Sequence, residues 1–252
     1  MYMIKKTIII GNMSLSYVDY NEDKTDIIFL FHGQSGSVNN WRKQLDSPLL
    51  SNYRLVAVDL PGHGSSGHSI YPSQEYSPLG TGKILSEFVK EISVGGRSIL
   101  TGFSYGANLV AEIIEQGFSP DGVIILGSSI LGNGFGMDKV FMPSPEQSIL
   151  TYNETDKERI SRFFKTNTNN LTDEDLNALA EDYLKVSPDF KPALFQTASE
   201  GKISDEINVL QNLQVPVLII FGENDTLVNK DYLDSLPFTT WQHTIYKIPG
   251  SG

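Results

Sequence analysis

Ser104 is the residue of this sequence whose surroundings best suit a nucleophile. It is the central residue of the sequence Gly-Phe-Ser-Tyr-Gly at positions 102–106. The apolar run before it predicts a strand, and the pattern after it predicts a helix. A turn this sharp strains the backbone of its central residue and leaves no room for side chains two residues to either side, a requirement that Gly102 and Gly106 meet. We expect the turn to lift the Ser104 hydroxyl beside the first N–H groups of the helix, whose partial positive charge suits an oxyanion.

The segments around Ser104 predict the sheet that must position it. Short, nearly continuous apolar runs are typical of strands buried on both faces, and they occur at residues 26–32, 54–60, 97–103, 122–127 and 215–222. Residues 13–20 alternate between apolar and polar types, which predicts a strand with one wet face near a sheet edge. Residues 84–92 and the segment after Phe103 have helical periodicity. Since strands and helices alternate, we predict an α/β fold with a mostly parallel sheet and helices on both faces.

One region interrupts this alternation. From about residue 128 to 213 no strand pattern occurs, while two helix starts have capping-box spacing, Thr155 with Glu158 and Thr172 with Asp175. We therefore expect a helical cap at 128–213, inserted between the core segments 1–127 and 214–252. Its aromatic and apolar residues either pack the cap's own helices onto the sheet, which we favour, or line a pocket beneath the cap. These residues are Ile160, Phe163, Phe164, Leu176, Leu179, Tyr183 and Leu184.

The composition of the chain excludes several classes of function. Its 252 residues include 30 acidic and 19 basic ones, and the formal net charge of −11 repels polyphosphates and anionic lipid headgroups. We therefore expect neither a nucleic acid nor a membrane as partner. No cysteine occurs, which excludes disulfides, thiolate metal sites and a cysteine nucleophile. The apolar run from Thr7 to Ile10 is too short for a signal peptide, and we expect a cytoplasmic protein.

Two glycine-rich motifs resemble nucleotide-binding sites, and neither has the context that such sites need. Residues 62–67 spell Gly-x-Gly-x-x-Gly after a strand, but Pro72 and Pro78 interrupt the segment where a dinucleotide site requires a helix. Residues 80–83 read Gly-Thr-Gly-Lys, and Ile84 stands where a phosphate loop needs Ser or Thr to coordinate magnesium. We therefore predict no nucleotide, no metal and no other cofactor.

Together the motifs resemble those of the α/β-hydrolase family, and the resemblance covers essentially the whole chain. Besides the serine turn, FLFHGQSGSVNNW at the third predicted strand is similar to the family's His-Gly oxyanion loop. VAVDLPGHGSSG at the next strand is similar to its Asp-x-Pro-Gly-His-Gly-x-Ser segment. The resemblance implies that the backbone N–H groups of Gln34 and Tyr105 hold the oxyanion. It also implies that Asp59 and His63 hold loops together and do not react.

A serine nucleophile needs a base to take its proton and a carboxylate to orient that base. The resemblance places the carboxylate at Asp225, in the sequence Gly-Glu-Asn-Asp after the seventh strand. Glu223 is the alternative acid, and the alternative role for Asp225 is to cap a helix that begins near Asn229. The family order of nucleophile, acid and then histidine leaves His243 as the candidate base among the four histidines. It lies about five residues, at about 3.3 Å each, before the end of its predicted strand, so we expect it to be too far away.

The sequence ends in Ile-Pro-Gly-Ser-Gly at Gly252. In the family that it resembles, a turn of this kind is followed by the catalytic histidine and a closing helix. We therefore expect the gene product to continue with histidine. We favour a shortened chain over a natural truncation or a pseudo-enzyme, because loss of the last helix would expose an apolar face of the sheet.

These residues predict a serine hydrolase that cleaves a small or medium carboxylic ester, thioester or lactone through an acyl-serine intermediate. Carbon–carbon bond hydrolysis, peptide hydrolysis and perhydrolysis stay open on the same scaffold, and so does a catalytically weak ligand-sensing or partner-binding protein. Ser104 disfavours dehalogenases and epoxide hydrolases, since both use an aspartate at that position. The expected partner is a small-molecule substrate, and the sequence leaves the acyl specificity and the oligomeric state open.

Overall fold

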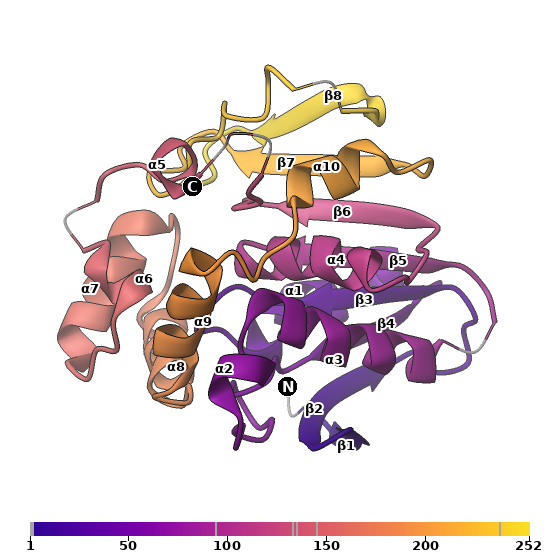
Figure 1. Cartoon of the computed structure of the whole chain (residues 1–252), viewed down its shortest axis with the longest axis horizontal. Coiled ribbons are helices and arrows are strands. Elements are labelled where there is room, and N and C mark those ends of the chain that lie inside the picture. Colours follow the sequence, from indigo (N-terminus) through magenta and orange to yellow (C-terminus); the bar gives the residue numbers. More distant parts are fainter. Residues whose placement is uncertain (1–2, 94, 133, 135, 145, 237) are drawn as a thin grey trace.

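The described residues, 3–93, 95–132, 134, 136–144, 146–236 and 238–252, form one sheet with helices packed around it (Figure 1). In this computed structural model the strand order is β1-β2-β4-β3-β5-β6-β7-β8. β2 pairs in antiparallel fashion with β1 and β4, and the other pairs are parallel, which confirms the predicted mostly parallel sheet. The strands are β1 (Lys5–Ile10), β2 (Met13–Tyr20), β3 (Ile27–Phe31), β4 (Arg54–Val58), β5 (Ser98–Phe103), β6 (Gly122–Leu126), β7 (Val217–Gly222) and β8 (Thr240–Ile248). The helices are η1 (Val38–Trp41), α1 (Arg42–Leu45), η2 (Pro48–Leu50), α2 (Pro72–Glu75), α3 (Pro78–Ile92), α4 (Tyr105–Glu115), α5 (Met137–Val140), α6 (Ser148–Thr151), α7 (Lys157–Asn167), α8 (Asp173–Leu184), α9 (Phe190–Ser199) and α10 (Glu206–Gln211).

Both faces of the sheet are covered, and β3 shows how its sequence achieves this. All the residues of β3 are buried. Ile27, Phe29 and Phe31 belong to the large apolar cluster that includes α3 and α4. Ile28 and Leu30 belong to a second cluster, with η1 and α1, on the other face. A strand buried on both faces needs apolar residues at every position, which accounts for the continuous apolar runs.

β2 differs from its prediction of one wet face. Ser16, on the polar side of the alternation, is buried. β2 lies between β1 and β4. The Ser66 hydroxyl, on the loop after β4, accepts a hydrogen bond of 2.9 Å from the Ser16 N–H. The loop thus bonds the backbone of β2, and Val18, on the same side of the strand as Ser16, belongs to the second apolar cluster, so alternation here does not mean exposure to water.

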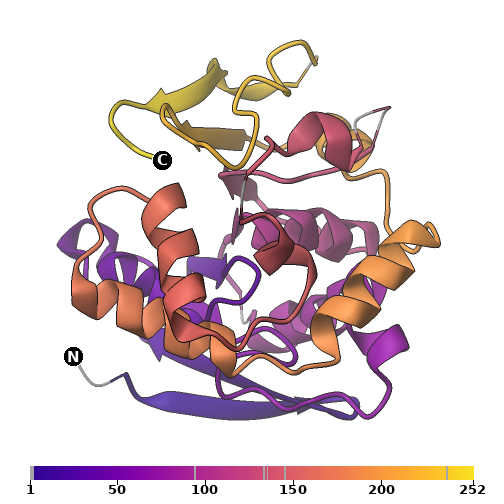
Figure 2. The ribbon, with the colours of Figure 1, turned by 90° about the vertical axis from the view of Figure 1, so that its left-hand side faces the viewer.

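Helices α6 to α9 lie together on one side of the molecule, at the left of Figure 1 and facing the viewer in Figure 2. The described residues between 128 and 213 form helices and no strand. α10 packs against α4. We keep the division into a core of 1–127 with 214–252 and a cap of 128–213 as a proposal.

The two predicted cap helix starts have different outcomes. Thr172 caps α8 as predicted, in a reciprocal capping box with Asp175. α7 begins one residue later than predicted, because Asp156 and not Thr155 is its N-cap and accepts a hydrogen bond from the Glu158 N–H. A carboxylate at this position also interacts favourably with the positive end of the helix dipole.

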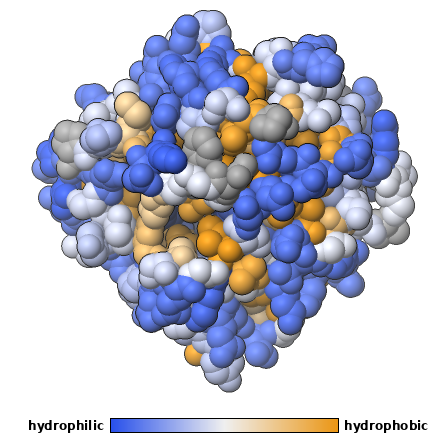
Figure 3. Space-filling view, turned by 45° about the horizontal axis from the view of Figure 1, so that its top comes forward, coloured by the Kyte–Doolittle hydropathy of each residue, from blue (hydrophilic) through white to orange (hydrophobic). Residues whose placement is uncertain are grey.

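Figure 3 shows the molecule with the top of Figure 1 tilted toward the viewer. On this face, patches of apolar residues are exposed among hydrophilic ones. On β8, Trp241 is 46% exposed and Ile248 is 44% exposed. Among the helices of the described residues, none combines the length and the apolar character needed to cross a membrane.

Candidate active site

Ser104 occupies the turn between β5 and α4, with the strained backbone that the sequence predicted. Its φ of 51° and ψ of −120° lie outside the regions that non-glycine residues favour. A Cβ on Gly102 would lie 2.3 Å from the carbonyl oxygen of Gly106, and a Cβ on Gly106 would lie 2.2 Å from that of Phe31. Ser104 is partly exposed, and its hydroxyl has no hydrogen-bond partner in the part of the chain that the structure describes. The turn thus presents an unengaged hydroxyl at the carboxyl end of β5.

Gln34 and Tyr105 line the same pocket as Ser104. The loop that carries Gln34 is close to the serine, since a Cβ on Gly33 would lie 3.2 Å from Ser104 Cβ. Tyr105 is the first residue of α4, where N–H groups have no intrahelical acceptor. Among the described residues, neither the Tyr105 N–H nor the Gln34 N–H has an acceptor. Both amides can therefore donate to a negative oxygen, and their role in an oxyanion hole stays a prediction.

The pocket beside Ser104 has a volume of about 90 Å³ and a mainly apolar lining. The cap contributes Leu150, Leu194 and Phe195, and the loop after β7 contributes Leu227. None of the described residues that line the pocket is charged. Such a lining favours an uncharged, apolar part of a ligand, because a buried charge without a partner is costly.

Most of the cap residues singled out from the sequence pack elsewhere. Ile160, Phe163 and Tyr183 form a small cluster within the cap, and Phe164 packs against it. None of them lines the pocket beside Ser104. The favoured prediction, that they pack the cap's own helices onto the sheet, is right for the packing within the cap and wrong for the sheet, because this cluster is separate from those that cover the sheet.

Asp225 lies on the loop after β7, close in sequence to the pocket residue Leu227. Its Oδ1 accepts hydrogen bonds of 2.9 and 2.8 Å from the N–H groups of Leu227 and Val228. No helix begins at Asn229 in the described chain, so the carboxylate caps its own loop and not a helix. Glu223 is exposed. These contacts fix the Asp225 carboxylate within its own loop, Asp225 is not among the described residues that line the pocket, and its role as the orienting acid stays a prediction.

The loop after β8 packs against the Asp225 loop. The Asn224 N–H donates a hydrogen bond of 2.7 Å to the Ser251 carbonyl. A Cβ on Gly222 would lie 2.6 Å from the Ser251 carbonyl oxygen, and a Cβ on Gly252 would lie 2.3 Å from that of Asn224. The glycines of the two loops therefore permit close contact at the carboxyl ends of neighbouring parallel strands.

His32 and His63 are buried and bond the backbone through both ring nitrogens. His63 Nδ1 donates to the Pro61 carbonyl at 3.0 Å, and its Nε2 accepts from the Ser35 N–H at 3.3 Å. Burial lowers the pKa of both rings, and that of His63 to about 3. Both stay neutral at neutral pH, and the contacts of His63 confirm that it holds loops together.

Asp59 has the same structural role. Its Oδ1 accepts from the Val38 N–H at 2.8 Å. Its Oδ2 accepts from the Ser65 N–H at 2.9 Å and from Lys5 Nζ at 2.7 Å. The carboxylate thus joins three segments, as predicted, and all its contacts lie within the scaffold.

His243 and His68 are exposed, and no histidine of the described chain lines the pocket beside Ser104. His243 has a φ of 56° and stands in an irregular part of β8, before Ile245 pairs with Ile219. The carboxyl end of β8 is at Ile248. His243 therefore lies at the opposite end of the strand from the Asp225 loop, as expected.

A polar network beneath the pocket was not anticipated from the sequence. Asn108, which lines the pocket, donates to Glu206 Oε2 at 2.6 Å and to the Ser129 carbonyl at 2.8 Å. Glu206 is fully buried, and burial raises the pKa of its carboxyl well above the ordinary value. Asn108 lies one helical turn after Ser104, a spacing that could have indicated it. Nothing in the sequence marks Glu206, whose contacts are far away along the chain.

The two glycine-rich motifs do not form phosphate sites. Residues 62–67 lie in turns, and residues 80–83 lie inside α3. The sequence predicted that Pro72 and Pro78 interrupt this segment, and this is wrong: they stand at the first positions of α2 and α3. Proline fits there because the first N–H of a helix has no intrahelical acceptor.

Comparisons with known proteins agree with this architecture. A family model described as the alpha/beta hydrolase family matches residues 27–252. A 2-hydroxy-6-oxononadienedioate/2-hydroxy-6-oxononatrienedioate hydrolase of Burkholderia vietnamiensis is 25% identical over 229 residues, which cover 85% of this chain and 76% of that protein. The structure of the N-acyl homoserine lactonase AidH complexed with N-butanoyl homoserine has a TM-score of 0.88 at 17% identity, and the match covers 99% of this chain and 89% of that one. An esterase of Rhodococcus has a TM-score of 0.77 at 23% identity, with 98% and 90% covered. The structural matches show a shared fold. Because the family model extends over more than half of the chain, the chain belongs to the alpha/beta hydrolase family.

Proposed function

We propose that this protein is a serine hydrolase that cleaves uncharged carboxylic esters, thioesters or lactones of small or medium size. The proposal depends above all on the Ser104 turn, which combines a strained backbone with an unengaged hydroxyl. The two N–H groups without acceptors and the apolar pocket support it. The likeness to an esterase and to a lactonase also supports this reaction class.

In the proposed reaction, Ser104 Oγ attacks the carbonyl carbon while a base takes the hydroxyl proton. The N–H groups of Gln34 and Tyr105 donate to the carbonyl oxygen as it becomes negative. Collapse of the tetrahedral intermediate leaves an acyl-serine and breaks the bond to the leaving oxygen or sulfur, which takes the proton from the base. An ester or thioester releases the alcohol or thiol, whereas the hydroxyl of an opened lactone stays attached to the acyl group. Water, activated by the same base, then releases the acid and restores Ser104. Asp225 orients the base and stabilises its charged form.

The proposed reaction needs a base, and none of the four histidines of the sequence lines the pocket beside Ser104. The four histidines of the sequence have other places, two bonded to buried backbone and two exposed away from the pocket. The loop after β8 packs against the Asp225 loop. A base at this contact would therefore stand next to the proposed acid.

A second candidate is hydrolysis of a 2-hydroxy-6-oxo dicarboxylic acid, because the matched Burkholderia enzyme carries that name. A dianionic substrate calls for cationic partners. No charged residue is present among the described residues that line the pocket, and the net charge is −11. Both facts favour an uncharged ester or lactone over a dicarboxylate.

The test is turnover of short-chain aryl esters and lactones by the wild type and by Ser104→Ala. We expect Ser104→Ala to remove turnover, because it removes the nucleophile. Ser119→Ala is the matched control, since Ser119 is exposed on the loop after α4. Equal turnover by Ser104→Ala would contradict the proposal. Labelling of Ser104 by a fluorophosphonate without any turnover would favour a ligand-sensing protein.

A further inference from the structure

Helix α6 forms part of the pocket wall and is too short to hold itself in place. Leu150 and Thr151 on α6 line the pocket, as does Gln147 just before it. A helix of one turn is unstable by itself in water. Its last carbonyl groups also have no intrahelical donors. Contacts with other elements must therefore fix the position of this wall.

Side chains from distant elements supply those donors. Lys191 Nζ, from α9, donates to the Ile149 carbonyl at 2.5 Å and to the Tyr152 carbonyl at 3.2 Å. Gln34 Nε2, from the loop after β3, donates to the Leu150 carbonyl at 2.6 Å. The wall is thus joined both to the cap and to the loop that carries a proposed oxyanion donor.

Lys191 is a buried amine without an ion-pair partner in the described chain. It is 1% exposed, and no carboxylate of the described residues forms an ion pair with it. Tyr183 on α8 completes its surroundings, with Nζ 3.9 Å from the ring centre and 2.5 Å from the hydroxyl oxygen. Burial is costly for an ammonium group, and it lowers the pKa of Lys191 to about 7. An apolar side chain would avoid this cost but could not donate to three fixed acceptors.

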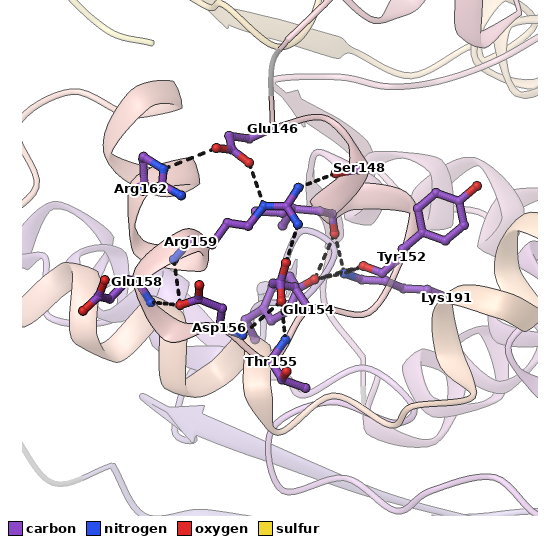
Figure 4. A network of polar contacts seen from close by, with 12 residues as sticks. Glu146, Ser148, Tyr152, Glu154, Thr155, Asp156, Glu158, Arg159, Arg162 and Lys191 are labelled. Atoms are coloured by element: carbon purple, nitrogen blue, oxygen red, sulfur yellow. Dashed lines mark hydrogen bonds and ion pairs between the residues drawn. The ribbon is translucent and has the colours of Figure 1, made fainter.

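Arg159 on α7 holds the outer side of the same segment (Figure 4). Its guanidinium bonds Glu146 before α6, Ser148 within α6 and Glu154 after α6. The Arg159 side chain is 36% exposed, and exposed ion pairs contribute little to stability. Lys191 and the Tyr183 hydroxyl, which also donates to the Ile149 and Tyr152 carbonyls, are therefore the polar anchors of α6 that are shielded from water, beside the buried Ile149 side chain.

We propose that Lys191, together with Tyr183, is a positioning residue that fixes the α6 wall and so sets the length of the substrate group that the pocket accepts. This inference rests on the proposed function for its substrate, but the position of the wall can be measured without turnover. Because Gln34 also bonds α6, a displaced wall weakens the support of the oxyanion loop.

The first test is hydrogen exchange of the backbone amides in the free protein, comparing the wild type with Lys191→Met. Methionine keeps the length of the side chain and removes the donors. We expect about tenfold faster exchange in residues 148–152, as for the loss of a buried hydrogen bond to a charged group. Lys185→Met is the matched control, since Lys185 is exposed on the same cap and has no side-chain partner in the described chain. Tyr183→Phe removes a single hydroxyl, and it replaces Lys191→Met in this experiment if Lys191→Met does not fold.

The second test compares kcat and KM for aryl esters of increasing acyl length. A loosened wall should flatten the dependence on length chiefly through KM, whereas a loss of folded protein would lower kcat for every ester equally. Unchanged exchange at α6, or faster exchange spread evenly over α7 and α8, would overturn the proposal. If Ser104→Ala leaves turnover unchanged, the proposed function fails, and the exchange experiment still decides the role of Lys191.

Discussion

His63 illustrates, at the scale of single residues, how the site depends on groups that bond the backbone. It accepts a hydrogen bond from the N–H of Ser35, which has a φ of 62°. Ser35 follows Gln34, so this bond holds the loop that presents a proposed oxyanion donor. A neutral imidazole is needed, because a protonated ring has no free nitrogen to accept the bond.

The lowered pKa of His63 predicts a dependence of stability on pH. Between its ordinary pKa and about 3, the unfolded chain takes up a proton at His63 that the folded chain does not. The free energy of unfolding therefore falls as pH drops below about 6.5, by at most about 1.4 kcal/mol per pH unit for this group. Urea denaturation at several pH values should show a shallower fall for His63→Gln than for the wild type. His68→Gln is the control, because His68 is exposed, and this variant should follow the wild type. Equal slopes of the free energy of unfolding against pH for all three proteins would contradict the assignment.

Some residues of the site could be predicted from the sequence, and others could not. The glycines around Ser104 were predictable because a sharp turn excludes side chains at fixed spacing. Lys191 was not, because its acceptors are mainly backbone carbonyls, which every residue type provides. Glu206 is hidden for a similar reason, since it bonds Asn108 and the Leu131 N–H from far along the chain.

At the scale of elements, the unit formed by β5, the Ser104 turn and α4 positions the nucleophile. A Cβ on Gly106 would lie 2.2 Å from backbone oxygen of β3, which cannot move aside as a flexible side chain could. We expect Gly106→Ala to destabilise the protein by about 1–3 kcal/mol and to lower activity, because α4 must shift away from β3. Gly122→Ala, at a position where the new Cβ meets its neighbours at 3.7 Å, is the control. Thermal unfolding and ester turnover measure both effects, and equal stability of the two variants would show that the turn tolerates a side chain.

Element types were easier to predict than their surroundings. The continuous apolar runs indicated buried parallel strands, because only a strand covered on both faces needs such a sequence. The alternation of β2 was misleading, since Ser16 on its polar side is buried. Periodicity within a strand reports the types of side chain and not what packs against them.

At the scale of the whole molecule, the apolar residues form separate clusters. The largest joins the sheet to α3, α4 and α10. The cap has its own small cluster around Ile149, Ile160 and Phe163, with Tyr183 beside them. Polar contacts such as those of Lys191 and Gln34 join α6 to the rest of the structure. The helices α6 to α8, with their small core, can open at a lower free energy than the sheet, whereas α9 and α10 contribute Phe190, Leu194, Ile207 and Leu210 to the largest cluster.

The separate clusters predict two levels of protection against hydrogen exchange in the wild type. Amides of α7 and α8 should exchange faster than those of β3, β5 and α4, because opening the cap exposes few buried apolar residues. Low concentrations of urea distinguish this opening from global unfolding. Exchange in the cap should depend weakly on urea, since little surface is exposed, whereas exchange in β3 and β5 should follow the slope of global unfolding. If cap and sheet amides shared one free energy and one urea slope, the chain would unfold as a single cooperative unit, and the cap would not be a separate part of the molecule.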